Sequence, residues 1–95
     1  MVNRIRQEIQ EGGFDVETFV GTIELFAFGF APRGWKLCDG TSLPVNSFPV
    51  LYSLIGVTYG GDGRSTFNIP NLLGTEPLPY MKYYIAIDGL YPTRP

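Results

Sequence analysis

The residues whose types and spacing could support chemistry are two aspartates and an arginine, Asp39, Asp62 and Arg64. Two carboxylates that face each other at about 5–9 Å can serve a glycosidase, and the three side chains together could form a polar site for a sugar or a cation. Each aspartate, however, precedes a glycine, as Asp39-Gly40 and Asp62-Gly63. Aspartate accepts backbone hydrogen bonds two residues on and glycine adopts positive φ. We therefore predict two structural turns here and no catalytic residue.

The protein contains no histidine and a single cysteine, Cys38, among its 95 residues. The lack of histidine excludes a Ser-His-Asp triad and a Cys-His pair. The single cysteine excludes an internal disulfide and a Cys/His zinc site. We therefore expect no metal site, no cofactor and no enzymatic activity, and we interpret Cys38, which has apolar neighbours, as a buried and inert thiol.

Aromatic residues make up 15% of the chain, which is more aromatic surface than so small a domain easily buries alone. We interpret Trp35 as a core or half-core residue whose indole N–H meets a backbone carbonyl. The alternative is a stacking platform for a sugar ring or for a partner side chain. Tyrosines, among them Tyr59 in a glycine-rich loop, combine a large apolar body with a polar tip and are favoured at interfaces. The aromatic content therefore indicates an interaction surface.

A turn-rich fold must position these residues, since the chain contains 12 glycines and 8 prolines. Alternating side chains predict strands over residues 20–28 and 81–88, and a very short strand over 66–69. Apolar residues at helical spacing predict a helix over 48–55 with Ser47 as its cap. Pairing the two longer strands gives a small, loop-rich α+β domain whose irregular middle folds over one face.

The first 17 residues differ from the rest, because they carry the whole net charge of −2. Within them Val2, Ile5 and Ile9 follow helical spacing. A helix of about two turns is marginal alone and needs a surface to pack on. We interpret residues 1–17 either as a frayed amphipathic tail or as an attachment arm that docks on its own trimer or on a neighbouring protein. The folded domain is then expected to span residues 18–95.

The composition also limits the kinds of partner. No basic block exists, so nucleic acid is not an expected partner. No apolar run approaches the roughly 18 residues of a transmembrane helix, and we expect no membrane insertion. The first residues lack the apolar segment of a signal peptide.

Four motifs in the middle of the chain are more specific than its composition. They are a G-x-I strand in Gly21–Phe26, an A-P-x-G-W-x-x-C-D-G block in Phe30–Gly40, a Y-G-G-D-G loop in Leu54–Gly63 and an F-x-x-P turn in Thr66–Leu72. In this order, and with the closing segment Tyr84–Pro95, they resemble the phage tail collar family. This is the domain of short tail fibres and of the microcystin-dependent proteins.

The chain departs from longer members of that family in two places. They usually carry a long glycine-rich insertion where this chain has only Leu73–Tyr80, and Asn71 stands where their turn has aspartate. Functions that the insertion hosts, including contacts of a fibre tip with the cell, are therefore in doubt. The His-x-His metal ladders of some fibre tips cannot form here, because histidine is absent.

The resemblance implies a non-enzymatic, homotrimeric component of a phage tail, in a tail fibre or associated with the baseplate. Its partners would be other tail fibre or baseplate proteins, and its location the virion tail or a contractile injection particle. The expected mechanism is rigid display of the loops around Trp35 and Asp62. The alternative is a receptor-binding module for host surface polysaccharide, and a cellular secreted protein with a collar domain is a third hypothesis. The candidate partner- or glycan-binding residues are Trp35, Asp39, Tyr59, Asp62 and Arg64.

Overall fold

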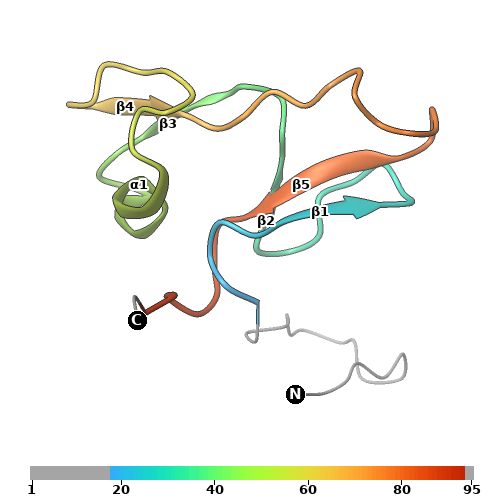
Figure 1. Cartoon of the computed structure of the whole chain (residues 1–95). Coiled ribbons are helices and arrows are strands. Elements are labelled where there is room, and N and C mark those ends of the chain that lie inside the picture. The colour runs from blue at the N-terminus through green and yellow to red at the C-terminus, as the bar shows by residue number, and fades with distance from the viewer. Residues whose placement is uncertain (1–17, 94–95) are drawn as a thin grey trace.

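Two small β-sheets and one short helix make up the domain (Figure 1). The computed structural model describes residues 18–93, so the predicted arm with Val2, Ile5 and Ile9 lies outside the described residues. The expected loop-rich α+β class is confirmed. In chain order the elements are β1 (Ile23–Phe26), β2 (Trp35–Leu37), β3 (Ser42–Pro44), α1 (Pro49–Ile55), β4 (Thr66–Asn68) and β5 (Lys82–Ala86).

Strand β5 is the centre of the larger sheet, whose order is β1-β5-β2. β1 lies antiparallel to β5 with Ile23 opposite Ile85, and β2 lies antiparallel to its other edge with Trp35 opposite Ala86. The predicted pairing of the two terminal strands is therefore confirmed. Tyr84, Ile85 and Ala86 of β5 are all buried, as expected for a strand flanked on both edges.

Both terminal strands are shorter than the predicted ranges 20–28 and 81–88. Before β1, the N–H of Val20 donates to the carbonyl oxygen of Leu90 at 2.9 Å, outside the regular ladder. After β5, the N–H of Ile87 donates to the carbonyl oxygen of Gly34 at 2.8 Å, in the turn that precedes β2. The alternation of side chains therefore continues beyond the paired strands, but the backbone groups of Val20 and Ile87 bond to residues outside the β1–β5 pair.

The smaller sheet pairs β3 and β4 antiparallel, with Leu43 opposite Phe67, and α1 lies beside it (Figure 1). The predicted helix and the predicted short strand are both present, within a residue of their expected bounds. The prediction that Ser47 caps the helix is wrong: Phe48 occupies the cap position and makes no side-chain capping bond. Pro49 follows at the start of the helix, and because proline has no N–H, the first turn has one unpaired backbone donor fewer.

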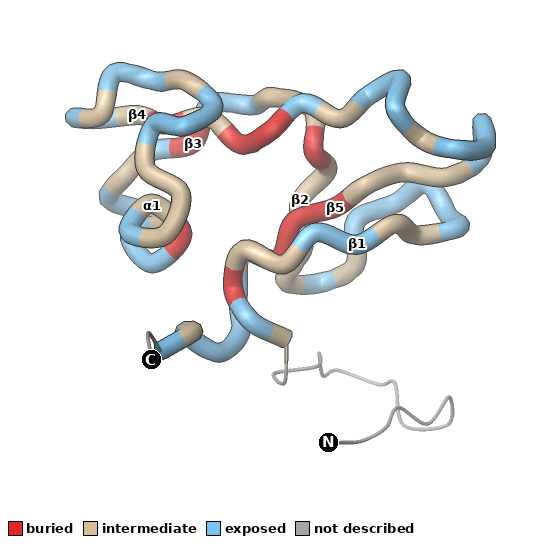
Figure 2. The backbone as a smooth tube through the Cα atoms, in the orientation of Figure 1, coloured by how far each residue is buried: buried red, intermediate tan, exposed pale blue. Residues whose placement is uncertain are grey.

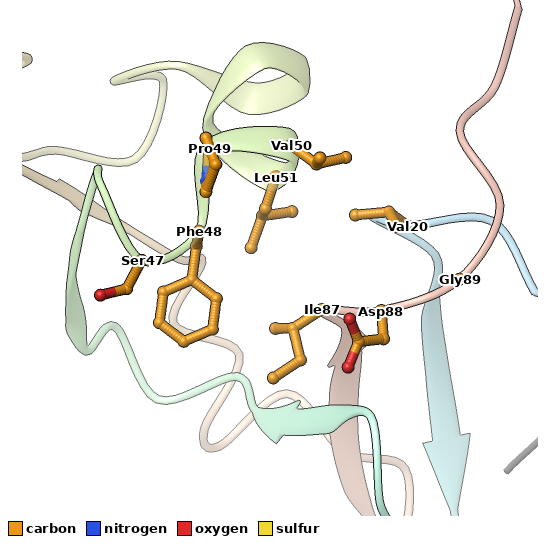
Figure 3. Close-up of a pocket in the computed structure, with 9 residues that line it drawn as sticks. All are labelled: Val20, Ser47, Phe48, Pro49, Val50, Leu51, Ile87, Asp88 and Gly89. Carbon is orange, nitrogen blue, oxygen red and sulfur yellow. The ribbon is translucent and has the colours of Figure 1, made fainter.

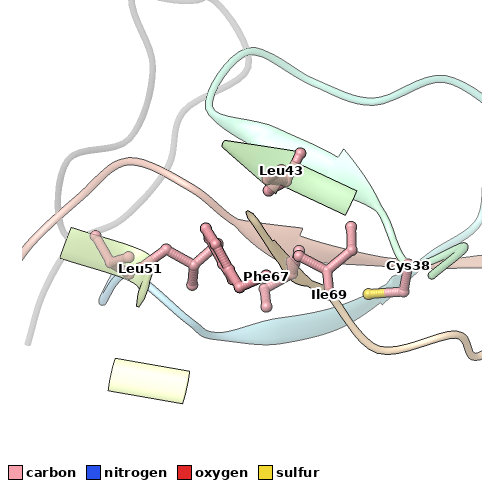
Figure 4. Close-up of a cluster of buried hydrophobic side chains, with 7 residues drawn as sticks. Cys38, Leu43, Leu51, Phe67 and Ile69 are labelled. Atoms are coloured by element: carbon pink, nitrogen blue, oxygen red, sulfur yellow. The ribbon is translucent and has the colours of Figure 1, made fainter. Parts of the chain in front are cut away.

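One hydrophobic core joins the two sheets and the helix, and it lies where the buried segments converge in Figure 2. Phe67 of β4 is fully buried, and the ring of Tyr52 from α1 packs against it with centroids 5.3 Å apart. Burying one such side chain contributes about 1.5–3 kcal/mol. The buried cluster, shown in Figure 4, consists of Val20, Cys38, Leu43, Leu51, Phe67, Ile69 and Ile85.

The segment after β2 ties the two sheets together through its backbone. The N–H of Cys38 donates to the carbonyl oxygen of Tyr83 at 3.0 Å, and the carbonyl oxygen of Cys38 accepts from Leu72 at 2.9 Å. Asp39 forms an isolated antiparallel bridge with Asn71. The backbone N–H of Cys38 is thus bonded to the larger sheet, and its carbonyl oxygen is bonded to the segment after β4.

Across residues 18–93, no helix has both the length and the apolar character needed to traverse a bilayer.

The beginning and the end of the described chain are also bonded to each other. Phe19 and Leu90 form a parallel bridge, and the N–H of Leu90 donates to the carbonyl oxygen of Thr18 at 2.8 Å. Gly89 makes this approach possible at a φ of 140°, because a Cβ there would collide with the Thr18 carbonyl oxygen.

Replacing Gly89 with alanine should therefore break this closure. We expect Gly89→Ala to lower the free energy of unfolding by at least about 3 kcal/mol, since it adds a backbone collision to a strained φ. Gly74→Ala is the matched control: Gly74 also has positive φ, at 89°, but a Cβ there meets nothing, so the loss should be about 1–2 kcal/mol. Urea unfolding measures both, and equal losses would contradict the closure.

Candidate functional site

The five candidate residues do not converge on one site. Trp35 begins β2 in the larger sheet and Asp39 follows that strand, whereas Tyr59, Asp62 and Arg64 lie in the loop between α1 and β4. In Figure 1 this loop lies at the end of the domain with α1 and β4, away from β1 and β2. The structure therefore brings three of the five residues onto one loop and leaves the other two elsewhere.

Asp62 organises its own loop through the backbone. Its Oδ1 atom accepts hydrogen bonds from the N–H groups of Arg64 at 2.8 Å, Ser65 at 2.9 Å and Thr66 at 2.9 Å, and its Oδ2 accepts the Ser65 hydroxyl at 3.0 Å. The N–H groups of Thr66, Arg64 and Ser65 hold the pKa of Asp62 well below its usual range. Gly61 lies against the backbone of Phe67, where a Cβ would collide with the Phe67 Cα. The interpretation of Asp62-Gly63 as a structural turn is confirmed.

Asp39 also has a turn role. Its Oδ1 accepts from the Thr41 N–H at 3.0 Å and from the Thr41 hydroxyl. Its bridge partner Asn71 accepts from the Leu73 N–H at 3.1 Å through its side-chain oxygen. An amide oxygen can accept this bond as a carboxylate would, so asparagine is compatible with the turn.

The two aspartates are separated by the smaller sheet. Asp39 lies beyond its Ser42–Asn68 pair, next to Asn71, whereas Asp62 bonds Thr66 at the opposite end of the ladder. They are therefore not arranged as two carboxylates facing each other across one site. Within the described part of the chain, no three histidine, cysteine, aspartate or glutamate side chains form a group that could hold a metal ion.

Cys38 is 1% exposed, as predicted for a buried thiol. Burial, with a smaller contribution from the charge of Asp39, raises the pKa of Cys38 to about 11. The thiolate is the reactive form of cysteine. The side chain therefore stays a protonated, apolar member of the core at neutral pH.

A row of stacked aromatic rings runs from the core to the surface beside β1; we call Tyr84, Phe26, Phe28 and Phe30 the aromatic row. Successive ring centroids are 5.4, 5.2 and 4.8 Å apart, at interplanar angles of 29°, 11° and 28°. Tyr84 is buried, while Phe28 is 40% and Phe30 66% exposed. The row thus begins in the core and ends on a ring that the described domain leaves largely uncovered.

The base of the aromatic row is fixed by two further contacts. The hydroxyl of Tyr84 donates to the carbonyl oxygen of Phe28 at 3.3 Å, and burial raises the pKa of this tyrosine. Trp35, half-buried as predicted, packs edge-on against Phe26 with centroids 5.0 Å apart. Phe28 and Phe30 are not among the five candidate residues, but their i, i+2, i+4 spacing from Phe26 and the high aromatic content of the chain both indicate an aromatic surface here.

A second exposed apolar feature is a groove between the start of α1 and the segment after β5 (Figure 3). Its volume is about 320 Å³. Val20, Phe48, Leu51 and Ile87 supply apolar walls, and Asp88 is the charged residue of its lining. The groove lies next to the place where the described chain begins.

Comparison with known proteins identifies one family. The family model described as Phage Tail Collar Domain matches residues 21–77, which is more than half of the chain. The match covers β1 to β4 and the loop of Asp62, and ends before β5. A comparison with curated proteins finds no match.

Removing the carboxylate of Asp62 should loosen the loop before β4. We expect Asp62→Ala to lower the urea midpoint of unfolding more than Asp62→Asn, because the amide keeps an oxygen that can accept from the backbone. Both variants lose the charge that strengthens these bonds.

The stabilisation that Asp62 provides should also depend on pH, and the same variants measure it. The pKa of Asp62 is lower in the folded than in the unfolded protein, so its stabilisation is complete above the unfolded value, near 4. It is lost as the pH falls below that value. The difference in unfolding free energy between the wild type and Asp62→Asn should thus be constant from about pH 7 to pH 5 and shrink below about pH 4. A difference that persists unchanged at about pH 3 would contradict this role.

Proposed function

Because the chain belongs to the phage tail collar domain family, we propose that it is a structural component of a phage tail that acts through protein–protein contacts. Membership of this family indicates a structural role in the tail and a location in the virion tail. The finer proposal is a homotrimer in a tail fibre or next to the baseplate. The observation that carries the protein–protein part of the proposal is the aromatic row.

The aromatic row has the properties of a prepared contact surface. Phe30 is 66% exposed, yet its ring is already stacked on Phe28 at 4.8 Å. A partner that covers such a ring gains roughly 1.5–3 kcal/mol from apolar burial and about 0.5–1.5 kcal/mol more if it contributes a ring of its own. Because the stack forms within the domain, less ordering remains to be done on binding.

We propose that copies of the chain meet through this row. The domain is small, and the core cluster of its described residues has seven buried members, while the side chains of Phe28 and Phe30 in the aromatic row are exposed. Association of three copies would cover apolar surface that one copy cannot cover alone. A homotrimer would also repeat the loop of Asp62 three times around one axis, which suits rigid display.

The attachment role of residues 1–17 is part of the proposal. The bonds between Thr18, Val20 and Leu90 support a domain boundary near residue 18, since the chain joins the folded unit there. The residues before it, with Val2, Ile5 and Ile9 on one predicted face, would then bind a neighbouring tail protein.

The alternative function, binding of host surface polysaccharide, is favoured by one observation. Tyr59 is 47% exposed and lies in the loop in which Asp62 accepts backbone hydrogen bonds. Trp35, however, packs edge-on against Phe26 in the larger sheet, away from this loop. A single short glycan would therefore have to use Tyr59 and the polar groups of its loop without Trp35.

The trimer is tested by light scattering on the purified protein. We expect the mass of three chains at micromolar concentration, and we expect Phe30→Ser to raise the dissociation constant at least about tenfold, because about 1.4 kcal/mol or more of apolar burial is lost. Tyr80→Ser is the control: Tyr80 is 81% exposed and has no ring contact among the described residues. A wild-type monomer would overturn the trimer, and equal effects of the two variants would remove the aromatic row from its interface.

Attachment is tested by deleting residues 1–17. We expect the shortened protein to remain folded, with a cooperative unfolding transition in urea, and to be absent from purified tails. Normal incorporation would refute the role of the arm. A glycan array separates the alternative: loss of glycan binding in a folded Tyr59→Ala variant would support it, and an array without binding by the wild type would remove it.

A further inference from the structure

We infer that the groove between α1 and the segment after β5 is a binding site for residues 2–9 of the same chain in the protein before it enters an assembly. The inference concerns the isolated protein and does not rest on the proposed tail function. It starts from the groove itself, which is open to solvent and whose lining combines apolar side chains with the polar residues Ser47 and Asp88.

The walls of the groove are mainly uncharged. Val20 and Leu51 are core residues that also face it, and Val50, which is 44% exposed, stands at its edge (Figure 3). Its volume of about 320 Å³ is roughly twice that of an engineered cavity known to hold a benzene molecule. More than one aliphatic side chain can therefore enter it.

The occupant is indicated by chain connectivity. Val20 lines the groove, and Thr18, two residues earlier, is bonded to Leu90 just past Gly89 at its other side. The point at which the described chain begins thus lies beside the groove. Eight residues lie between Ile9 and Thr18, and the nine Cα-to-Cα steps can span up to about 30 Å, so a return into the groove needs no strained path. Gly12 and Gly13 within this stretch let the backbone reverse.

The chemistry of the arm matches the groove. Val2, Ile5 and Ile9 recur at helical spacing and predict one apolar face. Within residues 2–9, Arg4 and Arg6 outnumber Glu8, which gives this segment a net charge of +1. Asp88 lies at the groove, so the charges are complementary.

The tether favours the same chain over a second one. A short linker raises the effective concentration of the arm at its own groove to the millimolar range, well above a micromolar solution of other copies. An amphipathic helix of about two turns is marginal in water and gains stability from such a surface.

Disulfide trapping in the full-length protein tests this proposal. We would compare Ile5→Cys combined with Val50→Cys against Ile5→Cys combined with Val57→Cys. Val50 and Val57 form a matched pair, because they are 44% and 47% exposed; Val50 lies in the first turn of α1 at the groove, and Val57 lies just after the end of α1 and outside the groove lining. Cys38, at 1% exposed, will not compete for the oxidant.

With oxidised glutathione, we expect the Val50 pair to form an intramolecular disulfide at least about ten times faster than the Val57 pair, because docking adds to the effective concentration that both pairs share. Mass spectrometry without reductant measures this. Equal rates would overturn the proposal, and so would a disulfide-linked dimer as the main product, which would assign the groove to the arm of another copy.

Hydrogen exchange provides a second measurement that needs no particular register between arm and groove. Ile5→Asp with Ile9→Asp should speed amide exchange several-fold in residues 50–51 and 87–88, while Gln7→Asp, on the opposite face of the predicted helix, should not. Unchanged exchange in both variants would overturn the proposal. Neither measurement involves other tail proteins, so failure here leaves the incorporation test of the arm unaffected.

Discussion

The burial of Phe67 is the packing constraint on which most of this domain depends. Its ring lies in the core against Tyr52 of α1, its strand β4 pairs with β3, and its backbone lies so close to Gly61 that a Cβ at Gly61 would collide with it. The loop before β4 must therefore pass directly over this strand. Asp62 then replaces the missing regular hydrogen bonds by accepting three backbone N–H groups at once. The Y-G-G-D-G loop and the F-x-x-P turn, which begins with Phe67, are thus two parts of one packing arrangement.

Local chemistry predicted much of this arrangement from the sequence. The alternation in the terminal strands, the Asp-Gly turn at Asp62 and the apolar surroundings of Cys38 each depend on nearby residues, and the structure confirms them. The cap at Ser47 was wrong because the helix begins with Pro49 after Phe48, so that the usual bond from a serine side chain is not made. The strand ends were wrong because Val20 and Ile87 bond residues far away in the sequence, which alternation cannot reveal.

The surfaces could not be predicted in the same way, since each joins distant parts of the chain. Phe26, Phe28 and Phe30 share a face by their spacing, but the row gains its anchor only when β5 places Tyr84 beside Phe26. The groove needs the start of α1, the residue Val20 and the segment after β5 together. For the same reason the five candidate residues did not form one site: pairs such as Asp39 and Asp62 looked alike in sequence, and the β3–β4 ladder separates them.

The distribution of polar groups fits the proposed protein contact better than the proposed sugar site. The Asp62 carboxylate, the strongest acceptor of its loop, already binds three backbone N–H groups and a hydroxyl of its own chain. Recognition of a sugar requires hydroxyl partners beside an aromatic face, and Asp62 has little accepting capacity to offer. The aromatic row, by contrast, ends on an exposed phenylalanine, which makes no demand for hydrogen bonds and matches the apolar face of another protein chain. The polar groups of the Asp62 loop therefore hold the shape of the loop itself, and the aromatic row leaves apolar surface exposed, as the proposed contact between protein chains requires.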